Sequence, residues 1–201
     1  MQTKRQIQKE KTKELLIRTA YEVFSSRGIM AARMSDIAEA AGVSHGTVFL
    51  HFQTQDALIE EVVESYGQKI AMRTHGLADT SEHFEELLRA HLDAITEFEP
   101  FYTRLVIENR LLPPGARISW IALQSAISLH FSLVYDRGSE KAFNKRVPPH
   151  MLFNMWMGLV HYYLGNGDLF APEGNVIRRY GDTLIQNYML LLTGDNQKNE
   201  S

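Results

Sequence analysis

The sequence predicts an all-helical protein. Apolar residues recur every three or four positions through most of the 201 residues, which is the period of a helix with one buried face. No segment shows the alternation of apolar and polar residues that marks a half-buried strand. Glycine and proline residues interrupt the pattern at the boundaries of the expected helices. We therefore expect a bundle of helices joined by short turns.

Four helices are expected in the first third of the chain. The first covers about residues 9–26, carries an apolar stripe on one face and is closed by Gly28. The second and third lie within residues 35–56. The fourth covers about residues 55–74, and the hydroxyl of Thr54 can cap its first turn.

The segment SDIAEAAGVSHGTVFLHFQTQD, residues 35–56, predicts two short helices around a tight turn. Gly42 ends the first helix, because glycine tolerates the positive φ that often follows a helix end. Ser44 can cap the second helix, which runs from His45 to Phe52. Two short helices crossing at a glycine-containing turn form a helix-turn-helix, whose second helix enters the DNA major groove. This segment therefore predicts DNA binding.

The rest of the chain predicts further helices separated by glycine and proline. They begin at a cap on Ser81, at Pro100, at about residue 115, at Pro148-Pro149 and at about residue 173. The segment from Gly165 to Asp168 is expected to form a turn. The polar tail from Gly194 to Ser201 is expected to be disordered.

Charge is distributed unevenly along the chain. The net charge is −3, yet residues 1–55 carry eight Lys and Arg against five acidic residues. Six of those bases lie in the first 18 residues. A basic end on an acidic body suits a polyanion partner at that end. Taken alone, however, the run is more simply explained as a frayed, solvated N-terminus.

Several function classes are disfavoured by what the sequence lacks. The absence of cysteine excludes disulfides and thiolate metal sites. No secretory signal is visible at the N-terminus, and no run approaches the roughly 18 apolar residues of a membrane span. Metal-protease, P-loop and nucleophile-elbow motifs are missing. His83 and His91 share a helix face, but eight residues span about 12 Å, too far for one ion. We expect a cytoplasmic protein that is not an enzyme and needs no metal, cofactor or membrane.

The N-terminal part resembles the DNA-binding domain of the TetR family of bacterial transcriptional regulators over roughly residues 10–65. The residues that carry this resemblance are Ala20, Phe24, Gly28, Asp36, Ile37, Ala38, Ala41, Gly42, Val43, Ser44, Gly46, Thr47, Phe49, His51, Phe52, Ala57 and Leu58. Residues 1–55 would then form a three-helix DNA-binding head, which the fourth helix joins to a larger effector-binding and dimerisation body, residues 56–201. The resemblance implies a homodimeric repressor that a small molecule releases from a palindromic operator.

Two residues depart from the family pattern. Gln55 stands where the family usually has a lysine that contacts phosphate, so this contact would be uncharged or absent. Arg33 stands where the family usually has threonine or serine at the start of the second helix. Arg33 gives up the hydroxyl cap but could reach a phosphate instead.

The expected DNA contacts combine phosphate binding with base reading. Gly46 allows close approach, and Thr47 can bond a base edge or rest its methyl on a thymine methyl. Leu50 either contacts a thymine methyl or packs on the fourth helix. Val48 and Phe52 should face inward, His51 in part. The expected DNA-binding residues are Arg33, Ser35, Ser44, His45, Gly46, Thr47, Phe49, Leu50, His51 and Gln55.

The helix over residues 150–164, HMLFNMWMGLVHYYL, is apolar nearly all round. Such a helix needs burial on every side, so we expect one face to form a subunit interface with the last helix. The resemblance implies the same dimer; a plain internal core helix is the alternative. The expected interface residues are Phe153, Trp156, Met157, Val160, Leu164, Ile177, Leu184 and Tyr188.

The body is rich in large, soft side chains, which suit either a core or an apolar ligand cavity. For any single residue the core is the simpler explanation. The resemblance implies that some of them line a pocket for a small, mostly apolar effector. The pocket residues expected on this basis are Tyr102, Trp120, Gln124, His130, Trp156 and His161.

One competing interpretation keeps the fold but not the function. A dimeric helical interaction module that has lost DNA binding would have the same architecture. The charge of only +3 on residues 1–55 and the uncharged Gln55 leave this alternative open. Salt-dependent binding to DNA would distinguish the two interpretations.

Overall fold

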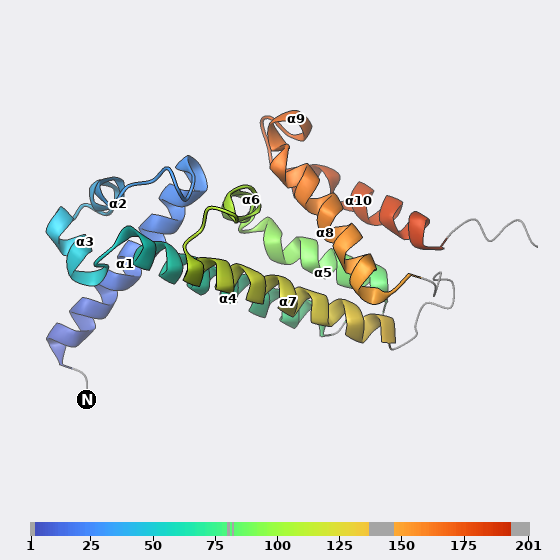
Figure 1. Cartoon of the computed structure of the whole chain (residues 1–201), viewed down its shortest axis with the longest axis horizontal. Helices are drawn as coiled ribbons and strands as arrows, with labels where there is room; N and C mark the ends of the chain where they lie inside the picture. Colours follow the sequence, from blue (N-terminus) through green and yellow to red (C-terminus); the bar gives the residue numbers. More distant parts are fainter. Residues whose placement is uncertain (1–2, 80, 82, 137–146, 194–201) are drawn as a thin grey trace, which may run out of the picture. The chain divides into compact units, whose positions relative to one another are not determined.

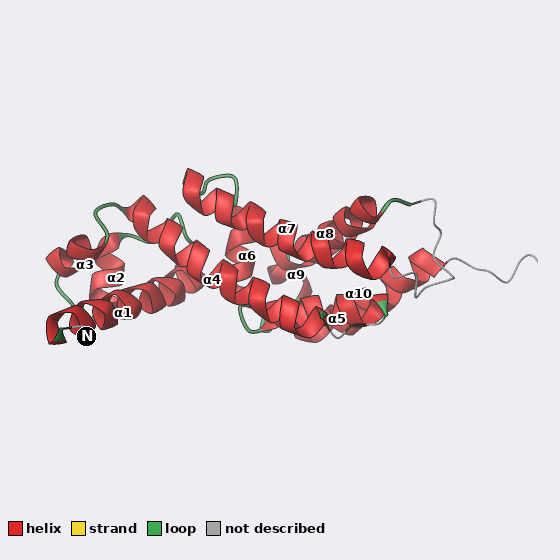
Figure 2. Ribbon diagram, turned by 90° about the horizontal axis from the view of Figure 1, so that it is seen from below, coloured by secondary structure: helices red, strands yellow, loops and turns green. Residues whose placement is uncertain are grey.

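A computed structural model of the chain describes residues 3–79, 81, 83–136 and 147–193, and every regular element in these ranges is a helix (Figure 2). The prediction of an all-helical protein is confirmed. The helices are α1 (Lys4–Arg27), α2 (Met34–Ala41), α3 (His45–His51), α4 (Gln55–Ala78), α5 (Phe84–Thr96), α6 (Glu99–Glu108), α7 (Pro114–Asp136), α8 (Pro149–Gly165), α9 (Gly167–Phe170) and α10 (Val176–Thr193).

The helices gather into two compact units (Figure 1). Unit 1 consists of residues 1–68 and 100–122, and unit 2 of residues 69–99 and 123–201. Helices α4 and α7 are each divided between the two units. Besides α1, α2 and α3, unit 1 therefore contains the start of α4, residues 100–108 of α6 and the start of α7. The assignment of DNA binding to residues 1–55 and of effector binding to the rest stays a prediction.

The core of unit 1 forms where α1 packs against α2 and the start of α4. Leu16, Ala20 and Phe24 of α1 are buried, as the apolar stripe predicted. The rings of Tyr21 and Tyr66 stack with centroids 3.8 Å apart, and both lie against Phe101 of α6. Aromatic pairs at such distances add to the stability that burial provides. Through these contacts α6 packs against both α1 and α4.

Helix α1 begins five residues earlier than predicted. Thr3 caps its first turn, and the Gln6 side chain in turn accepts a hydrogen bond from the Thr3 backbone N–H at 2.8 Å. Residues 4–11 are all exposed. They have no apolar stripe, so periodicity alone could not reveal these turns.

Unit 2 is built around α5, α8 and α10. Gly181 of α10 allows close packing on α5, because a Cβ there would lie 3.3 Å from Leu92. Helices α8 and α10 run antiparallel: the Tyr188 hydroxyl donates to the Leu152 carbonyl, and the rings of Tyr163 and Tyr180 lie 5.3 Å apart. The three helices therefore share one core.

The buried carboxylate of Glu99 caps α10. It accepts hydrogen bonds from the backbone N–H groups of Val176 and Ile177 at 2.6 and 2.9 Å. These N–H groups belong to the first turn of α10 and have no partner within the helix. Burial raises the pKa of Glu99, while the two backbone bonds act in the opposite direction.

Three expectations about this part of the chain need correction. Helix α5 begins at Phe84 with His83 as its N-cap, because the Glu86 carboxylate accepts from the His83 backbone; Ser81 instead donates to the carbonyl of Leu77 in α4. The expected turn after Gly165 contains the short helix α9. The sequence was also expected to contain no run long and apolar enough to span a membrane. Helix α7 meets these two criteria, which the core helices of soluble proteins can meet as well. The predicted disorder of residues 194–201 lies outside the described residues.

Candidate nucleic-acid interface

The turn between α2 and α3 has the geometry of a helix-turn-helix. Gly42 has a left-handed backbone with φ of 66°, and the Val43 N–H donates to the carbonyl of Ala38 at 3.0 Å. The Ser44 hydroxyl caps α3 by accepting from the Thr47 N–H at 3.2 Å. The predicted helix end at Gly42 and the predicted helix cap at Ser44 are confirmed. A single residue with positive φ thus reverses the chain at little cost.

Two buried side chains fix the orientation of α3. Val48 and Phe52 are both buried, as predicted, and they lie four residues apart on one face. Leu50 is 73% exposed and Phe49 41% exposed, and His45 and Gly46 are exposed as well. The outward face of α3 is therefore the one that the sequence predicted, and Leu50 does not pack on α4. Whether these residues contact DNA stays a prediction.

Three of the predicted contact residues already make hydrogen bonds within the chain. The hydroxyls of Thr47 and Ser44 are hydrogen-bonded to each other at 2.8 Å, and Thr47 is half-buried. The Gln55 amide donates to the carbonyl of Ala32 at 2.9 Å. Gln55, which stands where the family usually has a phosphate-binding lysine, thereby holds the loop before α2.

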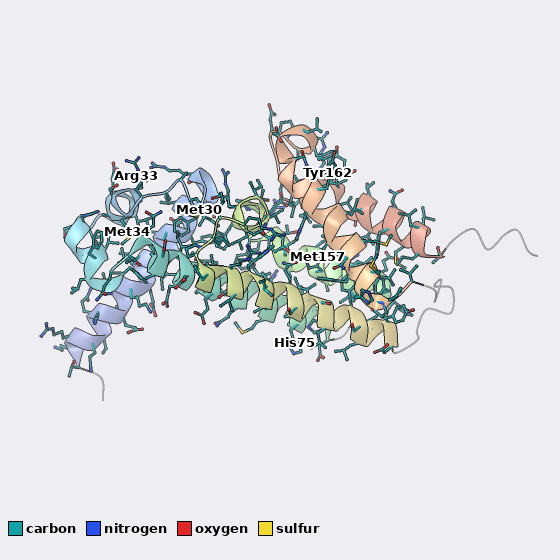
Figure 3. The ribbon with its side chains drawn as sticks, viewed as in Figure 1. Met30, Arg33, Met34, His75, Met157 and Tyr162 are labelled. Carbon is teal, nitrogen blue, oxygen red and sulfur yellow. The ribbon has the colours of Figure 1, made fainter. Side chains whose placement is uncertain are left out.

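Arg33 and Ser35 flank Met34, the first residue of α2, and both are exposed. Figure 3 labels Arg33 and Met34. The Arg33 side chain makes no capping bond, as expected. Its backbone N–H instead donates to the Asp36 carboxylate at 2.9 Å, and Asp36 also pairs with Arg27 at 3.2 Å. The Arg33 guanidinium is therefore exposed at the start of α2.

The basic first turns of α1 lie beside the end of α3, as Figures 1 and 2 both show. The pKa of half-buried His51 is lowered by burial and by the charges of Lys9 and Lys13. Lys13 is bonded to Glu61 at 2.7 Å. The remaining exposed bases of these turns are Lys4, Arg5, Lys9 and Lys11. The sequence showed this charge run, but we did not predict these residues as DNA contacts.

A carboxylate far along the chain holds the loop between α1 and α2. Glu108, the last residue of α6, accepts hydrogen bonds from the backbone N–H groups of Ile29 and Met30 at 3.2 and 2.8 Å. Gly28 has φ of 103°, and a Cβ there would lie 3.0 Å from the same carboxylate. Figure 3 labels Met30 in this loop, close to the start of α2. Glu108 therefore positions α2 from outside the N-terminal segment.

The predicted dimer-interface residues all lie in the core of unit 2. Trp156, Val160 and Tyr188 are fully or almost fully buried. The other five are also buried: Phe153, Met157, Leu164, Ile177 and Leu184. Helix α8 presents a different face to the surface, on which Met151, Met155 and Tyr162 are exposed. Figure 3 labels Tyr162 on this helix. These eight residues therefore face the core of their own chain, and their part in a dimer stays a prediction, because an uncharged helix does not reveal in its sequence which face its own chain covers.

The six predicted pocket residues divide between the units. Tyr102 and Trp120 lie in unit 1, with their rings 5.3 Å apart. Gln124, His130, Trp156 and His161 lie in unit 2. Two surface grooves, both in unit 2, are lined by other residues of α5 and α10. The pocket thus stays a prediction.

A buried histidine that we did not predict lies next to Trp156. His91 of α5 accepts a hydrogen bond at Nδ1 from the Trp156 indole N–H at 3.0 Å. Burial lowers the pKa of His91 to about 3 and that of His161 to about 4, so both rings are neutral at pH 7. Since Nδ1 accepts, the proton of His91 resides on Nε2. Within the described residues, this buried Nε2 has no hydrogen-bond partner.

Comparisons with known proteins identify relatives of the helix-turn-helix. Residues 16–62 match the family model of bacterial regulatory proteins of the tetR family. The uncharacterized HTH-type transcriptional regulator YerO of Bacillus subtilis is 24% identical over 176 residues, covering 82% of this chain and 58% of that protein. The HTH-type transcriptional repressor Rv3405c of Mycobacterium tuberculosis is 33% identical over 92 residues, covering 42% of this chain and 49% of that protein. The matches thus span about half the length of these relatives.

A solved structure shares the fold over nearly the whole chain. The transcriptional regulator FadR from Bacillus subtilis, in complex with stearoyl-CoA, aligns with a TM-score of 0.71 and 15% identity over 90% of this chain and 98% of that chain. The relatives are regulators rather than enzymes. Within the described residues, no three His, Asp or Glu side chains are grouped so that they could hold a metal ion.

Proposed function

Because the chain belongs to the TetR family of bacterial transcriptional regulators, we propose that it binds double-stranded DNA and regulates transcription in the cytoplasm. One observation carries this proposal: the outward face of α3. Val48 and Phe52 are buried and hold the inner face of this helix in place, while Gly46 and Leu50 are exposed on its opposite face. A short, firmly supported helix with an open face fits the major groove.

The affinity for DNA would come mainly from phosphate contacts. The exposed bases of α1 are Lys4, Arg5, Lys9 and Lys11, and the charge of Lys9 already acts on His51 at the end of α3, so these bases would supply phosphate contacts beside α3. The exposed guanidinium of Arg33 at the start of α2 would add a further cation. The base contacts of α3 would then select the sequence.

We infer a homodimer that reads a palindromic site. Helix α8 exposes Met151, Met155 and Tyr162, and antiparallel packing brings the exposed Leu190 and Leu191 of α10 to the Met151 end of α8. An exposed apolar face formed by two packed helices suits contact with the same face of a second copy, which would give a four-helix interface. A two-fold axis would place two copies of α3 about 34–36 Å apart, one turn of DNA.

The regulator would be a repressor that a small, mostly apolar effector releases from DNA. Support comes from the buried aromatic core of unit 2 and from the unpaired Nε2–H of His91, which an acceptor oxygen on a ligand could satisfy. The similar FadR structure holds stearoyl-CoA, an acyl thioester with such oxygens. Linkage requires that DNA weaken effector binding by the same factor as effector weakens DNA binding.

The interaction-module alternative keeps one supporting observation. The Gln55 side chain is used inside the chain, so one phosphate contact usual in the family is missing. The remaining bases around α3 would have to supply the affinity alone. A loss of DNA binding would leave the helical dimer intact.

The test is a salt titration of DNA binding with the purified full-length chain. Fluorescence anisotropy compares a duplex from the region upstream of its own gene with a random duplex of equal length. We expect the logarithm of the association constant to fall linearly with the logarithm of salt concentration, with a slope of about −0.9 per phosphate neutralised. The double variant Lys9→Gln, Lys11→Gln should flatten this slope by about 2.

The matched control is the double variant Arg178→Gln, Arg179→Gln, which removes two exposed bases of α10 in unit 2. Its slope should equal that of the wild type. If the effector-free chain binds neither duplex at low salt, the interaction-module alternative is correct and the DNA-binding proposal fails.

A further inference from the structure

The outward face of α3 offers few hydrogen-bonding groups to the bases. From His45 to His51 there is no Arg, Lys, Asn, Gln, Asp or Glu, the side chains that form the usual specific bonds with base edges. The Thr47 hydroxyl is bonded to that of Ser44 at 2.8 Å. The His45 ring lies edge-on to the Phe49 ring with centroids 4.8 Å apart. Base reading by this helix must therefore depend largely on apolar contacts.

Leu50 lies at the centre of the outward face. With 3.6 residues per turn, Leu50 points about 180° away from the midpoint between the buried Val48 and Phe52. Gly46 lies one turn before Leu50 on the same face, and its missing side chain lets the helix backbone approach the groove. Leu50, at 73% exposed, is also the most exposed large apolar residue of α1, α2 and α3.

The major groove presents one apolar group to such a side chain, the C5-methyl of thymine. Cytosine and uracil carry hydrogen at this position. A leucine at the centre of the recognition face therefore distinguishes pyrimidines by the presence of one methyl group. Phe49, which is 41% exposed and held by the His45 ring, extends the same apolar surface along the helix.

We propose that Leu50, with Phe49 beside it, reads a thymine methyl in each half-site, so that methyl recognition determines the sequence choice of this protein. This inference rests on the proposed function, because it requires DNA binding through α3. It predicts half-sites that contain a thymine under Leu50. It further predicts tolerance of 5-methylcytosine, and rejection of uracil and cytosine, at that position.

The experiment removes single methyl groups from the DNA. A preferred duplex is first selected from a random pool by the purified wild-type protein. Each thymine of one half-site is then replaced in turn by deoxyuridine, which leaves base pairing unchanged. We expect one position, or two adjacent ones, to weaken binding about 4-fold each, the effect of losing one buried methyl group. Replacing that thymine by cytosine should weaken binding further, and 5-methylcytosine should recover part of the loss.

A double-mutant cycle assigns the effect to Leu50. In Leu50→Ala the ratio of affinities for thymine and deoxyuridine at that position should fall to about 1. The matched control is Leu169→Ala on α9, since Leu169 is similarly exposed at 69% and lies in unit 2. This control should keep the full ratio. Thermal melting of both variants verifies that the exposed leucines are dispensable for folding.

The outcomes separate the inference from the proposed function. If the wild type selects and binds a duplex but no deoxyuridine lowers its affinity by more than about 1.5-fold, methyl reading is wrong while DNA binding stands. The same holds if Leu50→Ala keeps the preference for thymine. If no duplex is bound at low salt, the proposed function fails and the inference fails with it.

Discussion

Helices α3 and α8 have similar compositions but opposite exposure. Neither contains Lys, Arg, Asp or Glu, and both carry aromatic and large aliphatic side chains. In α3 the largest side chains, Phe49 and Leu50, are exposed. In α8 the largest side chain, Trp156, is completely buried.

The difference arises from how much of each helix its own chain covers. Helix α3 spans only seven residues and is held by two buried side chains, so its outer face is left exposed by the part of the chain that the structure describes. Helix α8 spans 17 residues and packs in a three-helix core, which buries six of them. Apolar character in the sequence therefore signals a contact, but not whether the contact is with the same chain or with a partner.

The largest expected effect tests the buried side of α8. Trp156→Ala should lower the free energy of unfolding by about 3–5 kcal/mol, because it leaves a cavity and removes the indole donor to His91. Urea denaturation at fixed protein concentration measures this change. The control Asn154→Ala, exposed on the same helix, should stay within about 0.5 kcal/mol. Equal losses in the two variants would contradict the assigned faces of α8.

The exposed side of α8 is tested by introducing a charge. Met155→Glu should weaken dimerisation at least about 100-fold, since a carboxylate would have to be buried without a partner. Sedimentation velocity over a concentration series measures the dissociation constant. Ile118→Glu on α7, an equally drastic change on another exposed surface, should leave the dimer unchanged. If Met155→Glu dimerises like the wild type, the proposed interface is wrong.

The pH dependence of stability tests whether His91 of α5 and His161 of α8 are neutral in the folded chain. The lowered pKa of His91 means that the unfolded chain binds a proton that the folded chain excludes, so stability falls as the pH falls from about 6.5 toward 3. From pH 7 to pH 5 we expect His91 to account for a loss of about 2 kcal/mol, and His161 acts with the same sign.

Chemical denaturation at both pH values measures this loss. In His91→Gln, whose side-chain oxygen can still accept from Trp156, the loss should be smaller than in the wild type. An identical pH dependence of wild type and variant would show that His91 is not neutral in the folded chain.

The smallest effects come from one glycine in each helix. A Cβ on Gly158 of α8 would meet nothing within 4 Å, and one on Gly46 of α3 only the Ser44 hydroxyl at 3.8 Å. Alanine at either position should therefore raise the free energy of unfolding by up to about 1 kcal/mol. Only Gly46→Ala should also weaken DNA binding, because it thickens the face that approaches the groove. Thermal melts and anisotropy titrations measure the two effects, and weaker DNA binding in Gly158→Ala would contradict this division.

The sequence predicted the helix-turn-helix well, because its signals are local. Gly42 and Ser44 act through backbone geometry within a few residues, and the spacing of Val48 and Phe52 defines the buried face of α3. Such signals can be identified from a few neighbouring residues without knowledge of the tertiary structure.

Features that depend on distant parts of the chain could not be predicted. Glu108 lies 78 residues after Met30, and His91 lies 65 residues before Trp156, so neither contact leaves a pattern in the sequence. The first turns of α1 form without a core-facing stripe, and the exposed face of α8 looks like its buried face in composition. In each case packing or capping, rather than local periodicity, determines where the helix begins, which face is buried or which residues make contact.

The bond between Glu108 and the loop at Met30 has a consequence for building hybrid regulators. The carboxylate from α6 satisfies two backbone donors that residues 1–55 leave open, and Phe101 of the same helix covers Tyr21. A contiguous N-terminal fragment grafted onto a foreign scaffold would arrive with two N–H groups unpaired and an aromatic ring uncovered. The unit that would carry the proposed DNA binding is therefore discontinuous, and a chimera needs α6 along with the first four helices.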